Sequence, residues 1–295
     1  MPSTASSLVA LASSVRIASR PTLVLVHGLD SSRETWSGTL SALLARGYPA
    51  ISLDLRGHGE SALGNPAGFS AEALARDVIE ATRAHGIERA VLVGHSMGGR
   101  VAMRAAAMEA GAGVESCLFS AVVIEDMDLR PRPEAPPISE ELEAVCARFE
   151  ALEGRRFATF ESCRAALLPF YADEARVDSW RGTRVRQQAD GSWWSDINPA
   201  AARLARDRVL ATDDGFRAWE ALASLSSLPF SLHVWHADEP GTVCALEGPG
   251  SVREMAARLP AAKVRCFAGA GHSVHNTAAE EFVEALCGVV DGQCQ

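Results

Sequence analysis

The pentapeptide GHSMG at residues 94–98 constrains the fold of this chain more than any other feature. A four-residue apolar run, residues 90–93, precedes it, and an Ala- and Met-rich helical pattern, residues 98–110, follows it. A G-x-S-x-G sequence between a strand and a helix is typical of a sharp turn that exposes the serine hydroxyl above a parallel sheet. Glycines suit such a turn because side chains there would collide with the neighbouring strand and helix. The motif therefore predicts an α/β fold with Ser96 as a nucleophile.

Apolar runs of strand length alternate with helical patterns along most of the chain. The runs cover residues 23–26, 50–53, 90–93, 117–125, 230–235 and 263–267. The helical patterns cover residues 36–46, 70–85, 98–110, 251–259 and 277–290. Short links between such elements predict a mostly parallel central sheet flanked by helices on both faces. Residues 8–17 are expected to add a shortened first strand or a hairpin.

This alternation is interrupted between residues 129 and 228. Helical patterns continue there, and Asn198-Pro199 opens one of them, but no parallel strand is evident. We interpret residues 129–228 as a helical cap inserted into the core. Residues 1–128 and 229–295 then form the two parts of the core domain.

Composition narrows the classes of partner and compartment. The net charge of the 295-residue chain is −9, and the sequence contains no block rich in Lys and Arg. Both features argue against nucleic acid or an anionic membrane surface as the main partner. No stretch approaches the roughly 18 uninterrupted apolar residues of a membrane span. Seven cysteines without paired or metal-ligand spacing predict reduced thiols in the cytoplasm and no metal site. The acid-free residues 1–29 leave an organelle leader as an alternative.

A serine hydroxyl needs a base, and the sequence offers one near its C-terminal end. The tetrapeptide GAGH, ending at His272, follows a strand and precedes the last helix, so His272 is expected above the same edge of the sheet as Ser96. His275 is the nearest rival, but it lies toward the start of that helix. His27 and His95 stand beside glycines at strand ends, where we expect each imidazole to brace neighbouring loops.

Two backbone N–H groups are predicted to stabilise a tetrahedral oxyanion. One belongs to Met97, which directly follows the nucleophile, and the other to Leu29, in the loop after the first strong strand. The side chains of Met97 and Leu29 would then only shape the pocket.

Two loops can present a carboxylate to the far side of the histidine, and the residues alone leave the choice open. The first loop offers Glu125, Asp126 and Asp128, and the second offers Asp238 and Glu239. Acids are frequent in exposed loops at strand ends, so each position also has a purely structural interpretation.

Four ordered segments, LVLVHGLDSS, LDLRGHGES, VLVGHSMGG and AGAGHSVH, together resemble the α/β-hydrolase superfamily. Within it the chain is similar to the small intracellular serine esterases with a cap. The resemblance implies that the triad acid follows the earlier strand, in VVIEDMDLRPRP, which favours Asp126. The stretch HADEP, with Glu239, lacks the glycine of the other common pattern. The resemblance further implies hydrolysis of a small-molecule carboxylic ester through an acyl-enzyme, without a metal or organic cofactor.

Other functions remain compatible with these residues. The same triad can cleave a thioester, a lactone, an amide or a carbon–carbon bond, since the cap sets the substrate. Dehalogenases and epoxide hydrolases of this fold use Asp where Ser96 stands. A non-catalytic ligand receptor on the same fold is the hypothesis from another class. In the cap, Trp180, Arg184 and Trp219 are candidates to meet a substrate carboxylate or ring, or to serve packing and solubility. Trp193-Trp194 is expected to pin the cap rather than line a pocket. The sequence specifies no oligomeric state.

Overall fold

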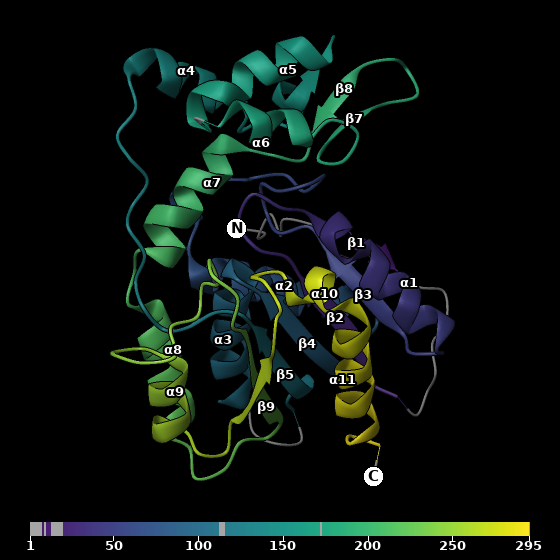
Figure 1. Ribbon diagram of the computed structural model, residues 1–295, viewed down its shortest axis with the longest axis vertical. Helices are drawn as coiled ribbons and strands as arrows, with labels where there is room; N and C mark the ends of the chain where they lie inside the picture. The colour runs from purple at the N-terminus through teal and green to yellow at the C-terminus, as the bar shows by residue number, and fades with distance from the viewer. Residues whose placement is uncertain (1–7, 9, 13–19, 112–115, 172, 295) are drawn as a thin grey trace, which may run out of the picture.

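The computed structural model describes residues 8, 10–12, 20–111, 116–171 and 173–294, and a seven-stranded sheet lies at its centre (Figure 1). In spatial order the strands are β1 (Ala10–Ala12), β3 (Ala50–Leu53), β2 (Thr22–Val26), β4 (Ala90–His95), β5 (Phe119–Glu125), β9 (Ser231–Ala237) and β10 (Lys263–Phe267). Only β1 runs antiparallel to its neighbour among these strands. The prediction of a mostly parallel sheet is confirmed.

Helices cover both faces of this sheet (Figure 1). One face packs against α1 (Ser37–Ala45) and α11 (Ala279–Asp291). The other face packs against α2 (Ala71–Ala84), α3 (Met97–Ala110), α8 (Asp214–Ala223) and α9 (Val252–Arg258). The central strands are therefore covered on both sides, which explains why they are continuous runs of Val, Leu and Ile rather than alternating patterns.

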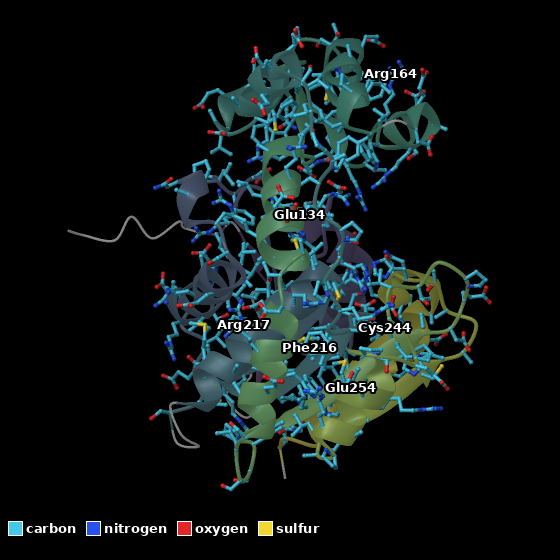
Figure 2. The ribbon with its side chains drawn as sticks, turned by 90° about the vertical axis from the view of Figure 1, so that its left-hand side faces the viewer. Glu134, Arg164, Phe216, Arg217, Cys244 and Glu254 are labelled. Carbon is cyan, nitrogen blue, oxygen red and sulfur yellow. The ribbon has the colours of Figure 1, made fainter. Side chains whose placement is uncertain are left out.

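The chain between β5 and β9 builds a separate layer above the sheet (Figure 1). Its helices are α4 (Glu140–Arg148), α5 (Phe160–Leu167), α6 (Glu174–Ser179) and α7 (Pro199–Ala205), followed by a π-helical turn, Arg206–Leu210. Figure 2 shows Arg164 of this layer far from Phe216, which belongs to α8 beside the core. The layer is not purely helical, because β6 (Arg156–Phe157), β8 (Trp193–Ser195) and β7 (Val185–Gln187) form a small antiparallel sheet.

The Trp pair in β8 stabilises this layer. The ring of Trp193 lies 5.4 Å from that of Phe160, and Trp194 donates its indole N–H to Asp196 at 3.1 Å. The guanidinium of Arg155 lies over the Trp194 ring. These contacts agree with a pinning role for the pair.

Within the predicted N-terminal span of residues 8–17, the structure describes one strand, β1, over Ala10–Ala12. β1 pairs antiparallel with β3, and residues 13–19 lie outside the described part of the chain. Most of the segment that suggested a leader, residues 1–7, 9 and 13–19, also lies outside it. No helix among the described residues is long and apolar enough to cross a membrane.

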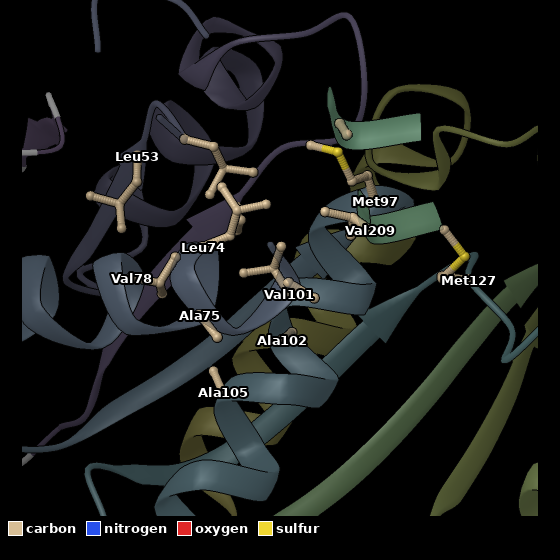
Figure 3. Packing of buried hydrophobic residues seen from close by; sticks show 14 of the residues in the cluster. Leu53, Leu74, Ala75, Val78, Met97, Val101, Ala102, Ala105, Met127 and Val209 are labelled. Atoms are coloured by element: carbon tan, nitrogen blue, oxygen red, sulfur yellow. The ribbon is translucent and has the colours of Figure 1, made fainter. Parts of the chain in front are cut away.

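The close packing of α2 against α3 depends on small side chains. Ala75 of α2 faces Ala105 of α3, and Val78 and Val101 fill the space beside them (Figure 3). All four side chains are buried. This contact fixes α3, and with it the N-terminal end that carries the GHSMG turn.

The strand order places the candidate site at a topological switch point. After β2 the chain moves to β3 on one side, and it then returns to β4 on the other side of β2. Loops that leave adjacent parallel strands in opposite directions open a crevice at the carboxyl end of the sheet, where ligands bind in open α/β sheets. The loops after β2 and β4 are those that contain Leu29 and Ser96.

Candidate active site

Ser96 occupies a strained turn between β4 and α3. Its φ of 52° lies in the left-handed region, which costs a non-glycine residue about 1–3 kcal/mol. The Ser96 N–H donates to the Glu125 carbonyl at 2.9 Å, which ties the turn to the end of β5. Although Ser96 is the N-cap residue of α3, its side chain makes no capping hydrogen bond. The partly exposed hydroxyl is therefore available for chemistry.

The glycines of the motif are required by close backbone contacts. A Cβ on Gly94 would lie 2.2 Å from the Gly98 carbonyl oxygen, and one on Gly98 would lie 2.5 Å from the Val26 carbonyl oxygen. Real Cβ atoms do not approach backbone this closely. The turn expected from the GHSMG sequence is thus present, and α3 packs directly on the end of β2.

The loop after β2 reaches Ser96. A Cβ built on Gly28 would lie 3.0 Å from the Ser96 Cβ, so this loop lies directly against Ser96. His27 braces this loop, because its Nδ1–H donates to the Gly28 carbonyl at 2.7 Å and its Nε2 accepts the Leu55 N–H at 3.1 Å. Burial lowers the pKa of His27 to about 4, which keeps the imidazole neutral, as the Nε2 acceptor role requires.

Two backbone N–H groups beside Ser96 have no acceptor within the described residues. They belong to Leu29 and Met97, the pair predicted from the sequence. Met97 is the first residue of α3, where a helical N–H has no partner inside the helix. Leu29 directly follows Gly28, the residue that contacts Ser96. Such a pair of unused donors can stabilise an oxyanion.

His272 and Asp126 form a short hydrogen bond. The Nδ1–H of His272 donates to Asp126 Oδ2 at 2.6 Å, and the backbone N–H groups of Val243 and Ala237 also donate to this carboxylate at 2.8 and 3.3 Å. Burial raises the pKa of Asp126, but these hydrogen bonds outweigh burial and the net pKa is lowered. Asp126 is therefore ionised, and His272 Nε2 makes no hydrogen bond within the described residues.

The other candidate acids have different partners. Glu125 contacts His275, and Asp128 forms ion pairs with two arginines. Asp238 accepts the backbone N–H of Gly269 at 2.7 Å, and Glu239 is exposed. Of the five carboxylates that the sequence left open, only Asp126 contacts His272.

A second His–carboxylate pair lies buried beneath the first. His275 Nδ1 contacts Glu125 Oε1 at 2.8 Å, its Nε2 contacts Thr35 Oγ1 at 3.0 Å, and Trp36 packs 4.2 Å from its ring. His95 lies between the two pairs, and its Nε2–H donates to the His272 carbonyl at 3.1 Å. His95 thus braces the His272 loop. The sequence marked His275 as a rival base without predicting that it would pair with Glu125.

The donor atoms of His95, Glu125 and His275 lie within 4.8 Å of one another, as metal ligands can. However, both nitrogens of His275 and the Nε2 of His95 are already used in hydrogen bonds. The three side chains are also buried. These nitrogens are therefore engaged within the protein, while Glu125 Oε2 has no hydrogen-bond partner among the described residues.

The layer above the sheet contacts the loop after β2 at Asp30. Tyr171 donates its hydroxyl to Asp30 Oδ1 at 2.6 Å, and Arg184 donates to the Asp30 carbonyl. Of the aromatic candidates, Trp219 is fully buried and donates to the Met255 carbonyl, so it contributes to packing. Trp180 packs edge-on against Tyr171. No short motif marks the Asp30 contacts, which join segments far apart in the chain.

Comparisons with known proteins agree with this architecture. The profile of the α/β hydrolase family matches residues 23–285. The sn-1-specific diacylglycerol lipase ABHD11 of Xenopus laevis is 26% identical over 287 residues, which cover 92% of this chain and 80% of that protein. Protein phosphatase methylesterase 1 of Mus musculus is 41% identical over 91 residues, only 30% of this chain and 24% of its own length.

A solved structure gives the same fold over nearly the whole chain. E-2-(acetamidomethylene)succinate hydrolase superposes with a TM-score of 0.62 at 24% sequence identity, covering 92% of this chain and 91% of that one. The sheet order, the GHSMG turn and the family profile point to the same conclusion. The chain belongs to the α/β hydrolase family.

Proposed function

We propose that this protein is a serine hydrolase that cleaves a carboxylic ester of a small molecule through an acyl-enzyme intermediate. The hydrogen bond between His272 and Asp126 beside the strained Ser96 turn carries this proposal. It supplies a base whose tautomer is fixed, since Nδ1 holds the proton and Nε2 is left to accept one.

Each group has one task in the reaction. Ser96 Oγ attacks the ester carbonyl while His272 Nε2 takes the hydroxyl proton, and Asp126 stabilises the imidazolium that forms. The N–H groups of Leu29 and Met97 donate to the oxyanion of the tetrahedral intermediate. His272 then returns the proton to the departing alcohol, and water hydrolyses the acyl-enzyme by the same steps.

Two of the named relatives support ester cleavage. The matching frog protein is named as a lipase and the mouse protein as a methylesterase, and both names denote ester hydrolysis. A free serine hydroxyl and a paired histidine also favour catalysis over a receptor role, because a receptor does not need the strain stored at Ser96.

Replacing the nucleophile tests the proposal. Ser96→Ala should lower turnover of 4-nitrophenyl esters by up to about a million-fold, because triad members act as a unit. It should also abolish labelling by a fluorophosphonate probe. Ser224→Ala is the matched control, since Ser224 is exposed and its hydroxyl only donates to the Ala221 carbonyl. A wild-type protein that is inert to the probe yet binds a small molecule would instead support the receptor.

A further inference from the structure

Three arginines of the upper layer converge on one residue, Asp30. Arg176 Nη2 lies 3.5 Å and Arg206 Nη2 lies 3.8 Å from Asp30 Oδ2, while Arg184 donates to the Asp30 backbone carbonyl. Burial lowers the pKa of Arg184, Asp30 opposes this effect, and the charge of Arg176 adds to it. One negative charge thus faces three positive charges.

The donors of Arg176 and Arg206 are largely unused. Their distances to Asp30 exceed those of an N–H···O hydrogen bond, and Asp30 is the only ion-pair partner of either within the described residues. Their side chains are 47% and 40% exposed, so a ligand can reach them. Asp207, next in the chain to Arg206, instead accepts the N–H of Ala135.

Two other arginines of the same layer pair with acids. Arg164 pairs with Glu174 and Asp178, and Arg156 pairs with Asp190. The excess of positive charge at Asp30 is therefore a local property in a chain whose net charge is −9.

This charge lies close to the nucleophile. Asp30 follows Gly28 by two residues, so their Cα atoms are at most about 7.6 Å apart, and Gly28 contacts Ser96. Arg206 begins the π-helical turn that packs on α3, and in Figure 3 Val209 of that turn lies beside Met97. Two independent contacts thus connect the arginines to the two sides of the predicted oxyanion site.

A pocket of about 450 Å³ lies against Tyr171 and Arg206. Its other lining residues are mostly apolar, including four prolines at positions 136, 137, 169 and 199. Arg203 also lines the pocket, and no described lining residue is acidic. A small organic acid fits such a pocket, because apolar walls accept its carbon chain while a guanidinium fixes its charged end.

We propose that Arg176 and Arg206 form an anion subsite that binds a free carboxylate carried by the ester substrate. The proposal rests on the proposed function, because it names the class of ester that the Ser96 site receives. Guanidinium groups match carboxylates in geometry as well as in charge, and a hydrogen bond to a charged group contributes more than one between neutral groups. The subsite therefore selects hemiesters and other acidic esters.

The test compares matched esters with and without the carboxylate. One pair, mono-4-nitrophenyl glutarate and 4-nitrophenyl valerate, differs on the acyl side, and a second pair, 4-acetoxybenzoate and its methyl ester, differs on the alcohol side. We expect the acidic ester to have the higher kcat/KM in at least one pair. Arg206→Met should lower the ratio of acidic to neutral kcat/KM about ten- to a hundred-fold, and Arg206→Lys should restore part of it.

Arg156→Met is the control, since this arginine of the same layer pairs with the exposed Asp190 and not with α6, so it should leave both ratios unchanged. Equal kcat/KM within both pairs, or ratios that Arg206→Met does not alter, would overturn the subsite while leaving the esterase intact. Loss of turnover of every ester and of probe labelling would instead contradict the proposed function. In that case glutarate itself tests the subsite: it should raise the melting temperature of wild type more than that of Arg206→Met.

Discussion

Three acids at the end of β5, Glu125, Asp126 and Asp128, have different roles because they contact different partners. Glu125 is buried against His275, Asp126 contacts the partly exposed His272, and Asp128 pairs with two arginines. Only the second of these pairs combines an ionised carboxylate with an imidazole that has a free nitrogen. Catalytic assignment at this strand end therefore follows from contacts rather than from residue type.

Replacing the Asp126 carboxylate with an amide tests the role of Asp126 as the partner of His272. Asp126→Asn should lower kcat by up to about ten-thousand-fold, because the amide neither fixes the tautomer of His272 nor stabilises its imidazolium. Glu239→Gln, which alters an exposed side chain, should change kcat only a few-fold. Steady-state hydrolysis of a 4-nitrophenyl ester at one pH measures both. The opposite ranking would move the acid to the loop after β9.

The Glu125–His275 pair is expected to matter for stability. Burial raises the pKa of Glu125, but the nearby His275 and His95 outweigh burial and the net pKa is lowered. Glu125→Gln removes the carboxylate from a buried, hydrogen-bonded imidazole, and weakening the hydrogen bonding of a buried polar group costs about 1–3 kcal/mol. Urea unfolding at neutral pH measures this loss, with Glu239→Gln as the control. Equal unfolding midpoints for wild type and Glu125→Gln would contradict a stabilising role of this contact.

Among the elements, the β4–α3 turn depends most on glycine. Gly98→Ala would place a Cβ against the Val26 and His27 carbonyl oxygens, so strand and helix must separate. We expect a loss of about 1–3 kcal/mol and reduced activity, since the same shift displaces Ser96. Gly288→Ala in α11, where a Cβ meets nothing within 4 Å, should raise stability by about 0.5–1 kcal/mol. Thermal and urea unfolding compare the two. Similar melting temperatures would show that the turn tolerates a side chain.

Continuous apolar strands and a capped helix with clear ends were predictable, whereas the shortest strands were not. The residues of β3 and β10 match their predicted spans, and Ser70 caps α2 as expected. The strands of the small upper sheet have only two or three residues, too few to show a period. α8 lies within the span predicted for the cap, yet it packs on α3 of the core. The sequence pattern does not show this placement, because the contact joins segments that are far apart in the chain.

The candidate site divides in the same way. Ser96 and His272 stand in short motifs whose neighbours determine their local structure, so the sequence could indicate them. The Asp126 contact needed the register of β5 against β9, which a single sequence does not reveal. Asp30 meets Arg176 and Arg206 across more than a hundred residues of chain, and no local pattern predicts such a contact.

At the scale of the whole molecule, buried histidines couple folding to pH. Burial lowers the pKa of His27, His95 and His233 to about 4 and that of His58 to about 3. An imidazole in the unfolded chain has a pKa of about 6.5. Between these values the unfolded chain binds protons that the folded chain does not. Acid therefore favours unfolding across this range.

We expect the free energy of unfolding to be nearly constant above pH 7 and to fall between pH 6.5 and 5. Each buried imidazole contributes up to about 1.4 kcal/mol per pH unit in this window. Glu125 and Asp126, whose pKa values are lowered, add to the loss only at lower pH, where the unfolded carboxylates are protonated. Urea unfolding at pH 7.5, 6.5, 5.5 and 5.0 measures the slope. His233→Gln, a change outside the candidate site, should make the slope of stability against pH shallower. A wild-type stability that is independent of pH from 7 to 5 would show that these imidazoles accept protons in the folded state.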